Sequence, residues 1–155
     1  MSIVASGDGT IIYDANNPAK ISTTKLIQVG KLTKIENAHL WTHTDTPSGT
    51  GSTFDTRPNV TATYCIGDTS PSPDSLTQFQ YPVGNPEPVA QYTFVKAVQF
   101  SPAGEARIDN STYSLQPAAE IGLMATHRTT VDTTSPNLVA IQITGLGGDV
   151  RIYRR

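Results

Sequence analysis

The chain has 155 residues, which suits one domain spanning residues 1–155 and leaves no room for a second large core. Eleven basic and thirteen acidic residues give a formal net charge of −2, which excludes a protein that attracts nucleic acid or anionic membranes through its overall charge. Charged residues make up only 15% of the sequence. This share lies below the roughly 25% usual in soluble domains and disfavours a helical protein. No apolar run approaches the roughly 18 residues that a membrane-spanning helix needs.

The first half of the chain predicts short strands separated by turns. Alternating or β-branched segments, each followed by Gly, Asp, Asn or Pro, occur at 10–13, 25–29, 38–43 and 60–66. In the third of these, His39, Trp41 and His43 would share one face of the strand. Segment 32–35 is the one stretch that could form a short helix, although the nearby Gly30 weakens that reading.

Two long polar segments predict loops. Residues 44–57 contain two glycines and a single Phe, and residues 67–91 contain five prolines, too many for a central strand of a sheet. Both exceed the usual length of a connection between elements. We expect them to carry partner contacts or disorder rather than core residues.

The last third predicts two hairpins and a strand between them. The first hairpin joins strand 92–100 to 105–108 through a turn with Pro102 and Gly104, and the second joins 138–143 to 150–153 through the Gly-rich stretch 145–149. A further strand is expected at 119–124. Together these segments predict a mainly β, antiparallel fold with at most one short helix.

Chemical motifs are weak throughout. His39 and His43 could share a transition metal but have no third ligand nearby, and the loop residues Asp8, Asp55, Asp68, Asp74 and Asp132 lack the dense spacing of a calcium loop. No Gly-x-Ser-x-Gly elbow or phosphate-binding loop occurs. Cys65 lies in an apolar alternation, where a thiol behaves as a small hydrophobe. We therefore predict no enzyme, no cofactor and no metal.

The C-terminus concentrates positive charge. Arg151, Arg154 and Arg155 lie beside Tyr153 in the last five positions. Guanidinium groups next to an aromatic ring can hold phosphates or stack on bases, so these four residues are the candidates for a partner or nucleic-acid contact. The alternative is a strand end that keeps the domain soluble.

Several segments of the last third resemble the C-terminal part of the H-type minor pseudopilins, subunits of type II secretion and type IV pilus-like machines. The resemblance rests on an apolar strand ending in Phe100, the Pro102-x-Gly104 turn, the strands around Glu120–Leu123 and Val139–Thr144, and Gly145 before a closing strand with Arg. It covers about the last 60 residues, and Leu32–Leu40 is similar to the strand that follows the family's N-terminal helix.

The resemblance implies a two-sheet β head domain of pseudopilin type, which counts as α+β once the family's apolar N-terminal helix is included. That helix, absent from this chain, would anchor the protein at the periplasmic face of the bacterial inner membrane. Partners would be other pseudopilin subunits, reached through the helix and the sheet edges. The expected core of the head is Phe94, Val98, Phe100, Ile121, Leu123, Ile141, Ile143 and Ile152.

Two other functions stay open at this point. Some similar family members take up DNA through basic residues near the Gly-rich turn, which makes Arg151, Arg154 and Arg155 the matching candidates here. Asp149, which directly follows Gly148, stands where a basic residue would help such binding. A surface-adhesion or carbohydrate-binding β module is the third reading.

Overall fold

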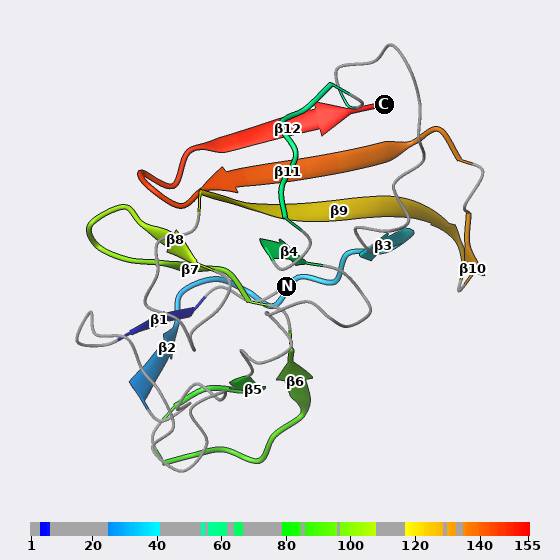
Figure 1. Cartoon of the computed structure of the whole chain (residues 1–155). Helices are drawn as coiled ribbons and strands as arrows, with labels where there is room; N and C mark the ends of the chain where they lie inside the picture. Colours follow the sequence, from blue (N-terminus) through cyan, green and yellow to red (C-terminus); the bar gives the residue numbers. More distant parts are fainter. Residues whose placement is uncertain are drawn as a thin grey trace.

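The computed structural model describes residues 4–6, 25–40, 54, 56–61, 64–66, 79–84, 86–95, 97–107, 117–128, 130–132 and 135–155. The secondary-structure elements that these residues form are all β-strands, which confirms the predicted mainly β fold. The strands, labelled in Figure 1, are β1 (Val4–Ser6), β2 (Leu26–Gln28), β3 (Ala38–Leu40), β4 (Cys65–Ile66), β5 (Phe79–Tyr81), β6 (Tyr92–Phe94), β7 (Gln99–Phe100), β8 (Ala106–Arg107), β9 (Ala118–His127), β10 (Thr130–Val131), β11 (Leu138–Thr144) and β12 (Val150–Arg154).

A six-stranded sheet forms the body of the domain. Its strands follow the order β10-β9-β11-β12, and β3 and β4 also pair with β9. All pairings are antiparallel except that of β4 with β9. The long strands β9, β11 and β12 lie side by side across the upper part of Figure 1, with β12 at the edge. The predicted strand 119–124 and the predicted hairpin of 138–143 with 150–153 are thereby confirmed.

The other described strands form three two-stranded ribbons: β1 with β2, β5 with β6, and β7 with β8. The β7–β8 ribbon is the hairpin predicted around Pro102 and Gly104. The continuous strand predicted at 92–100 is wrong, because its two ends pair in different ribbons, and Val95, Ala97 and Val98 between them are in no ladder. Part of the segment 67–91, predicted as a loop, forms a strand, since β5 lies within it.

The central sheet has two unlike faces because side chains alternate along each strand. One face carries Met124, Leu138 and Ala140, and here these residues pack against Phe54 in a buried cluster that Tyr153 borders. We call it the Phe54 face. The stretch around residues 56–61 runs across β12 and β11 on this side (Figure 1).

The opposite face, which we call the apolar face, carries residues that point away from Phe54. Toward β4 it is packed, since Ile66 and Ala119 form a cluster bordered by Leu40, Tyr64, Val98 and Ile121. Toward the sheet edge it opens, and the side chains of Val150 and Ile152 on β12 are 54% and 55% exposed. The remaining members of the apolar face are Leu123, Val139, Ile141 and Ile143.

The expected core is therefore partly wrong. Phe100 and Ile152 are each 55% exposed, whereas Phe54, from a segment predicted as a non-core loop, is completely buried. Ile143 is buried as predicted. The error has a geometric reason: Ile152 lies on the edge strand, where no further strand of the described chain covers it.

Other expectations have mixed outcomes. The segment 32–35 has no helix, and its residues are exposed. The predicted strands at 25–29 and 38–43 are represented by β2 and β3. The predicted strand 10–13, residues Trp41 and His43, the loop tip 44–53 and residues 67–78 lie outside the described chain. Within the described residues, no helix has the length and apolarity required to cross a lipid bilayer.

Candidate protein-contact surface

The residues of the family pattern come together at one end of the sheet. The amide of Ala106 donates to the carbonyl oxygen of Gly145 at 3.0 Å, and the amide of Gly145 donates to the carbonyl oxygen of Pro117 at 3.2 Å. The first bond fastens the β7–β8 hairpin to the connection between β11 and β12, and the second fastens that connection to the residue before β9. Pro102 lies exposed in the β7–β8 turn, in which the Gly104 amide donates to the Ser101 carbonyl oxygen at 2.9 Å.

The two turns approach so closely that side chains are excluded between them. A Cβ on Gly148 would lie 3.0 Å from the carbonyl oxygen of Gly104 and 3.5 Å from the ring of Phe100. Phe100 thus lies against the glycine turn, with much of its ring exposed, instead of entering the core. Gly148 and Gly104 also have positive φ angles of 65° and 88°, a conformation that favours glycine.

We expect Gly148→Ala to destabilise the domain by about 1–2 kcal/mol from backbone strain alone, and by more once the contact with Gly104 is forced apart. Gly147→Ala is the matched control, because Gly147 also has a positive φ but only the Asp149 carboxylate lies near its Cβ position, at 3.8 Å. Urea denaturation of both variants measures the difference. Equal losses would show that the turns are not in close contact.

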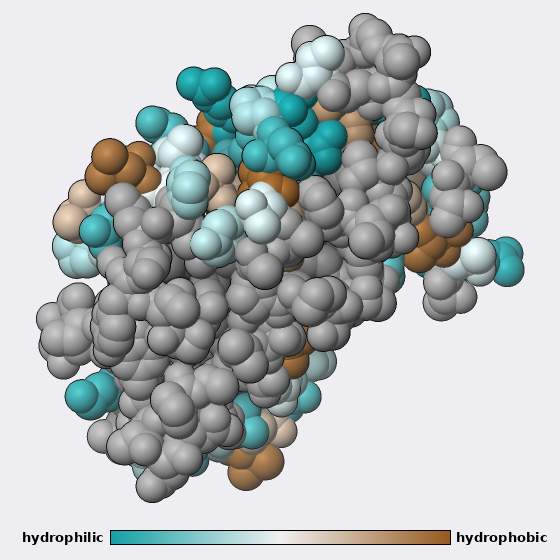
Figure 2. Space-filling model, viewed as in Figure 1, coloured by the Kyte–Doolittle hydropathy of each residue, from teal (hydrophilic) through white to brown (hydrophobic). Residues whose placement is uncertain are grey.

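Exposed apolar residues also occur at this end of the sheet. Leu146, in the connection between β11 and β12, is 73% exposed, and the exposed Val150 and Ile152 come after it in the chain. Figure 2 shows the side on which residues 56–61 cross the sheet; there, apolar atoms protrude at the end where Figure 1 places this connection. Exposed apolar residues that gather over neighbouring elements mark surfaces that meet other proteins. Phe100, Leu146, Val150 and Ile152 are each more than half exposed and form the candidate contact surface.

The predicted C-terminal candidates do not form one patch. Arg151 and Tyr153 lie on the Phe54 face, because they pair with Gln142 and Ala140 of β11. Arg154 lies on the apolar face, next to Val150 and Ile152 in the alternation of β12. Tyr153 is half-buried against the Phe54 cluster, and the Arg155 amide donates to the carbonyl oxygen of Leu138 at 3.1 Å. The three arginine side chains are exposed.

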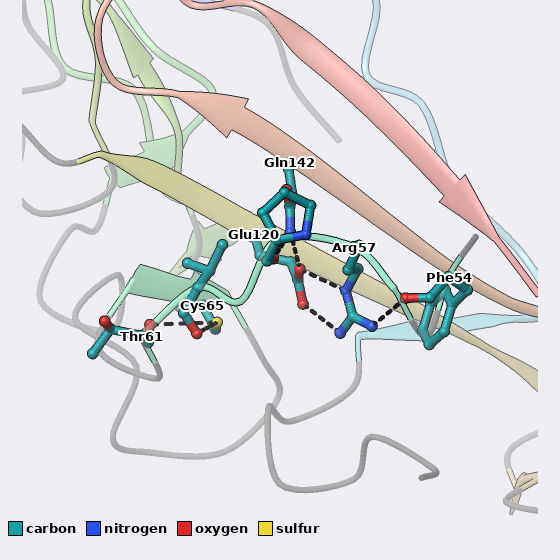
Figure 3. A network of polar contacts seen from close by, with 8 residues as sticks. Phe54, Arg57, Thr61, Cys65, Glu120 and Gln142 are labelled. Carbon is teal, nitrogen blue, oxygen red and sulfur yellow. Dashed lines mark hydrogen bonds and ion pairs between the residues drawn. The ribbon is translucent and has the colours of Figure 1, made fainter. Parts of the chain in front are cut away.

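A buried ion pair holds the crossing segment against the Phe54 face (Figure 3). Arg57 donates to Glu120 through Nε, at 2.8 Å from Oε2, and through Nη2, at 3.0 Å from Oε1. The two side chains are only 9% and 4% exposed. Nη1 of Arg57 donates to the carbonyl oxygen of Phe54 at 2.9 Å, and the guanidinium lies 4.3 Å from the centre of the Phe54 ring.

Gln142 completes this network from the neighbouring strand. Its Nε2 donates to Oε2 of Glu120 at 2.8 Å and to the carbonyl oxygen of Pro58 at 2.6 Å. The charges and amide protons of the network are therefore paired with one another, as buried polar groups require. Its contacts join the crossing segment to β9 and β11 and so hold that segment on the sheet.

Cys65 lies beside this network, in register with Glu120 in the sheet. The thiol is buried and faces the carbonyl oxygens of Thr61 and Val60, at 3.5 and 3.8 Å (Figure 3). Burial, assisted by the Glu120 carboxylate and opposed by the Arg57 guanidinium, raises the pKa of Cys65 from 9.0 to about 12. A thiol with a raised pKa is a poor nucleophile near neutral pH, in accord with the reading of Cys65 as a hydrophobic residue.

We expect the free energy of unfolding to fall as pH rises from 9 to 12, because the unfolded chain loses the Cys65 proton at a lower pH than the folded chain does. Below pH 9 the thiol is protonated in both states and this contribution is fully present. Lysines and tyrosines titrate in the same range, so the measurement is the difference between the wild type and Cys65→Ala at each pH. A difference that does not change over this window would contradict the raised pKa.

No metal-binding group of three or more His, Cys, Asp or Glu side chains occurs in the part of the chain that the structure describes. The closest contact of this kind joins His127 Nε2 to Asp132 Oδ2 at 3.3 Å, with the His127 side chain largely exposed. His39 is described on β3, but His43, Asp8, Asp55, Asp68 and Asp74 are outside the described residues.

Comparisons with known proteins add no relationship: no family model, no curated protein and no solved structure matches the chain.

Sequence reasoning missed both Phe54 and the ion pair. Phe54 stands in a polar run without any periodicity. Arg57 and Glu120 are 63 positions apart, so no local pattern links them. One signal was present, because Glu120 and Gln142 each interrupt an otherwise apolar strand, and a polar residue in such a strand needs a buried partner.

Proposed function

We propose that this domain is the head of a minor pseudopilin, a non-enzymatic subunit that acts by protein–protein contacts in a type II secretion or type IV pilus-like assembly. The observation that carries the proposal is the apolar face of β11 and β12. One face of the sheet is covered by Phe54 and the segment that follows it, whereas Val150 and Ile152 on the other face are more than half exposed. A β-sheet with such an open apolar face suits a module that packs against an apolar partner surface.

The family resemblance suggests that the partner surface is an apolar helix. In the full-length protein, an apolar helix would precede this domain and hold it at the periplasmic face of the bacterial inner membrane. The apolar face would then lie against helices of the same or neighbouring subunits. The packing of Phe100 and Gly104 on the Gly145–Gly148 turn supports the resemblance in one respect, because residues from separate parts of the sequence pattern meet in space.

Nucleic-acid binding is the less supported proposal. Arg151 and Arg154 lie on opposite faces of the sheet, and Tyr153 is half-buried, so the group does not offer one continuous basic and aromatic surface. A salt-dependent gel shift that disappears on replacing Arg151, Arg154 and Arg155 would favour this function. An adhesion or carbohydrate-binding role would instead require binding to a glycan array.

The reading frame that encodes the chain tests the main proposal. We expect it to specify a prepilin leader and an apolar helix upstream of this domain, and we expect its deletion to abolish secretion or pilus assembly. The control is complementation with the intact gene. A reading frame without such a leader, together with normal secretion and pilus assembly after deletion, would contradict the proposal.

A further inference from the structure

The outer edge of β12 has backbone groups that the described sheet does not use. The Thr144 amide donates to the Asp149 carbonyl oxygen at 2.9 Å, and the Arg155 amide to that of Leu138 at 3.1 Å. Because hydrogen-bonded pairs alternate along an antiparallel ladder, Tyr153 and Arg151 also direct their backbone groups toward β11. The N–H and C=O groups of Val150, Ile152 and Arg154 therefore point outward from the sheet.

From this edge we infer that two copies of the chain pair through β12, antiparallel and about a two-fold axis at Ile152. In this register Ile152 lies opposite Ile152 of the second copy, and Val150 lies opposite the second copy's Arg154. These are the residues with outward-directed backbone groups, so every pair can exchange both of its hydrogen bonds. The inference does not depend on the proposed function, because it concerns the isolated domain.

The side chains of this register are complementary. On the apolar face, the exposed Val150 and Ile152 of both copies form one row, with each Arg154 stem packing over a valine. On the Phe54 face, Arg151 lies opposite the second copy's Tyr153, a pair that allows a cation–π contact. No arginine lies directly opposite another arginine, so the register avoids the most destabilising like-charge pairs.

Neighbouring registers are worse. A slide of two residues in one direction places Arg151 opposite Arg151 of the second copy, and like charges directly opposite are destabilising. A slide of two residues in the other direction places Tyr153 opposite Tyr153 and moves Val150 past the end of the second copy's β12. The Ile152-centred register alone keeps all five residues of β12 in the ladder.

The register is tested by sedimentation velocity of the 155-residue chain at micromolar to millimolar concentration. The wild type is expected to dimerise. Ile152→Lys and Ile152→Glu each place like charges opposite one another and should weaken dimerisation at least about tenfold. An equimolar mixture of the two variants should dimerise again, because position 152 pairs with itself.

Leu146→Lys and Leu146→Glu are the matched controls, since Leu146 is exposed but lies outside the ladder, and they should dimerise like the wild type. If the charged variants at position 152 do not fold, Ile152→Cys should form a disulfide between copies on mild oxidation, whereas Leu146→Cys should not. A wild type that is monomeric at every concentration would overturn the inference. The arginines of β12 would then be residues that prevent pairing at the sheet edge. Dimers that survive both charge variants, or a mixture that stays monomeric, would equally overturn it.

Discussion

Replacing Phe54 by alanine is expected to lower the free energy of unfolding by about 3–5 kcal/mol, the loss typical of a fully buried phenylalanine. The ring is completely buried among Met124, Leu138 and Ala140, and it also receives the Arg57 guanidinium on its face. Removing it leaves a cavity beneath the crossing segment, which the sheet cannot fill by a small movement.

Phe100→Ala is the control for this prediction. The sequence predicted Phe100 as one of the core residues, but it is 55% exposed, so its removal should cost less than about 1.5 kcal/mol. Urea denaturation curves of the two variants, fitted with the same m value, compare their free energies of unfolding directly. If Phe100→Ala is the more destabilising of the two, the core has been placed on the wrong side of the sheet.

Glu120→Ala should destabilise the domain by about 3–5 kcal/mol, because it leaves the buried Arg57 charge without its carboxylate. Gln142 loses the acceptor of one of its hydrogen bonds in the same step. The control is Glu36→Ala, which breaks the exposed pair of Glu36 with Lys34 at 2.9 Å. An exposed pair of this kind contributes at most about 1 kcal/mol.

A double variant separates the charge from the packing. Combining Glu120→Leu with Arg57→Met removes both charges together, and its stability should recover much of the loss seen for Glu120→Ala. The physical reason is that burial penalises an unpaired ion far more than a pair of apolar side chains. A double variant as unstable as Glu120→Ala would show that Arg57 and Glu120 contribute through contacts other than their ion pair.

The strands that could be predicted are those whose side chains alternate and whose ends carry a turn signal. β9, β11 and β12 have long apolar alternation, and the turn at Gly104 combines proline with glycine, and the turn at Gly145–Gly148 contains three glycines, with positive φ angles at Gly104, Gly147 and Gly148. Local pattern and tertiary structure agree at these positions. The hairpins could therefore be predicted from residues close together in the chain.

The rest depends on contacts between distant segments. Phe54 is buried only because its segment crosses the sheet, and nothing in the polar sequence around it predicts that path. Phe100 ends an apolar run and looks like a core residue, yet its strand stops after two residues and its ring is used against Gly148. The exposure of Val150 and Ile152 depends on β12 being the edge strand, and strand order is not encoded in local alternation.

This edge position also connects the two proposals. The proposed contact with pseudopilin partners would use the side chains of the apolar face, whereas the inferred pairing of two copies uses the outward backbone of β12. Val150→Asp separates them. This substitution places a carboxylate on the apolar face, which should weaken packing against an apolar helix. The same carboxylate lies opposite Arg154 of the second copy, so the pairing of two β12 strands should be preserved.

The most direct test of the proposal that the apolar face of β12 meets other subunits is site-specific photo-crosslinking from Val150 of the protein in the cells that encode it. The account predicts crosslinks to pseudopilin subunits, while the same probe at the exposed Lys34, remote from β12, forms few or none. Crosslinks to nucleic acid, or equal crosslinking from the two positions, would contradict it.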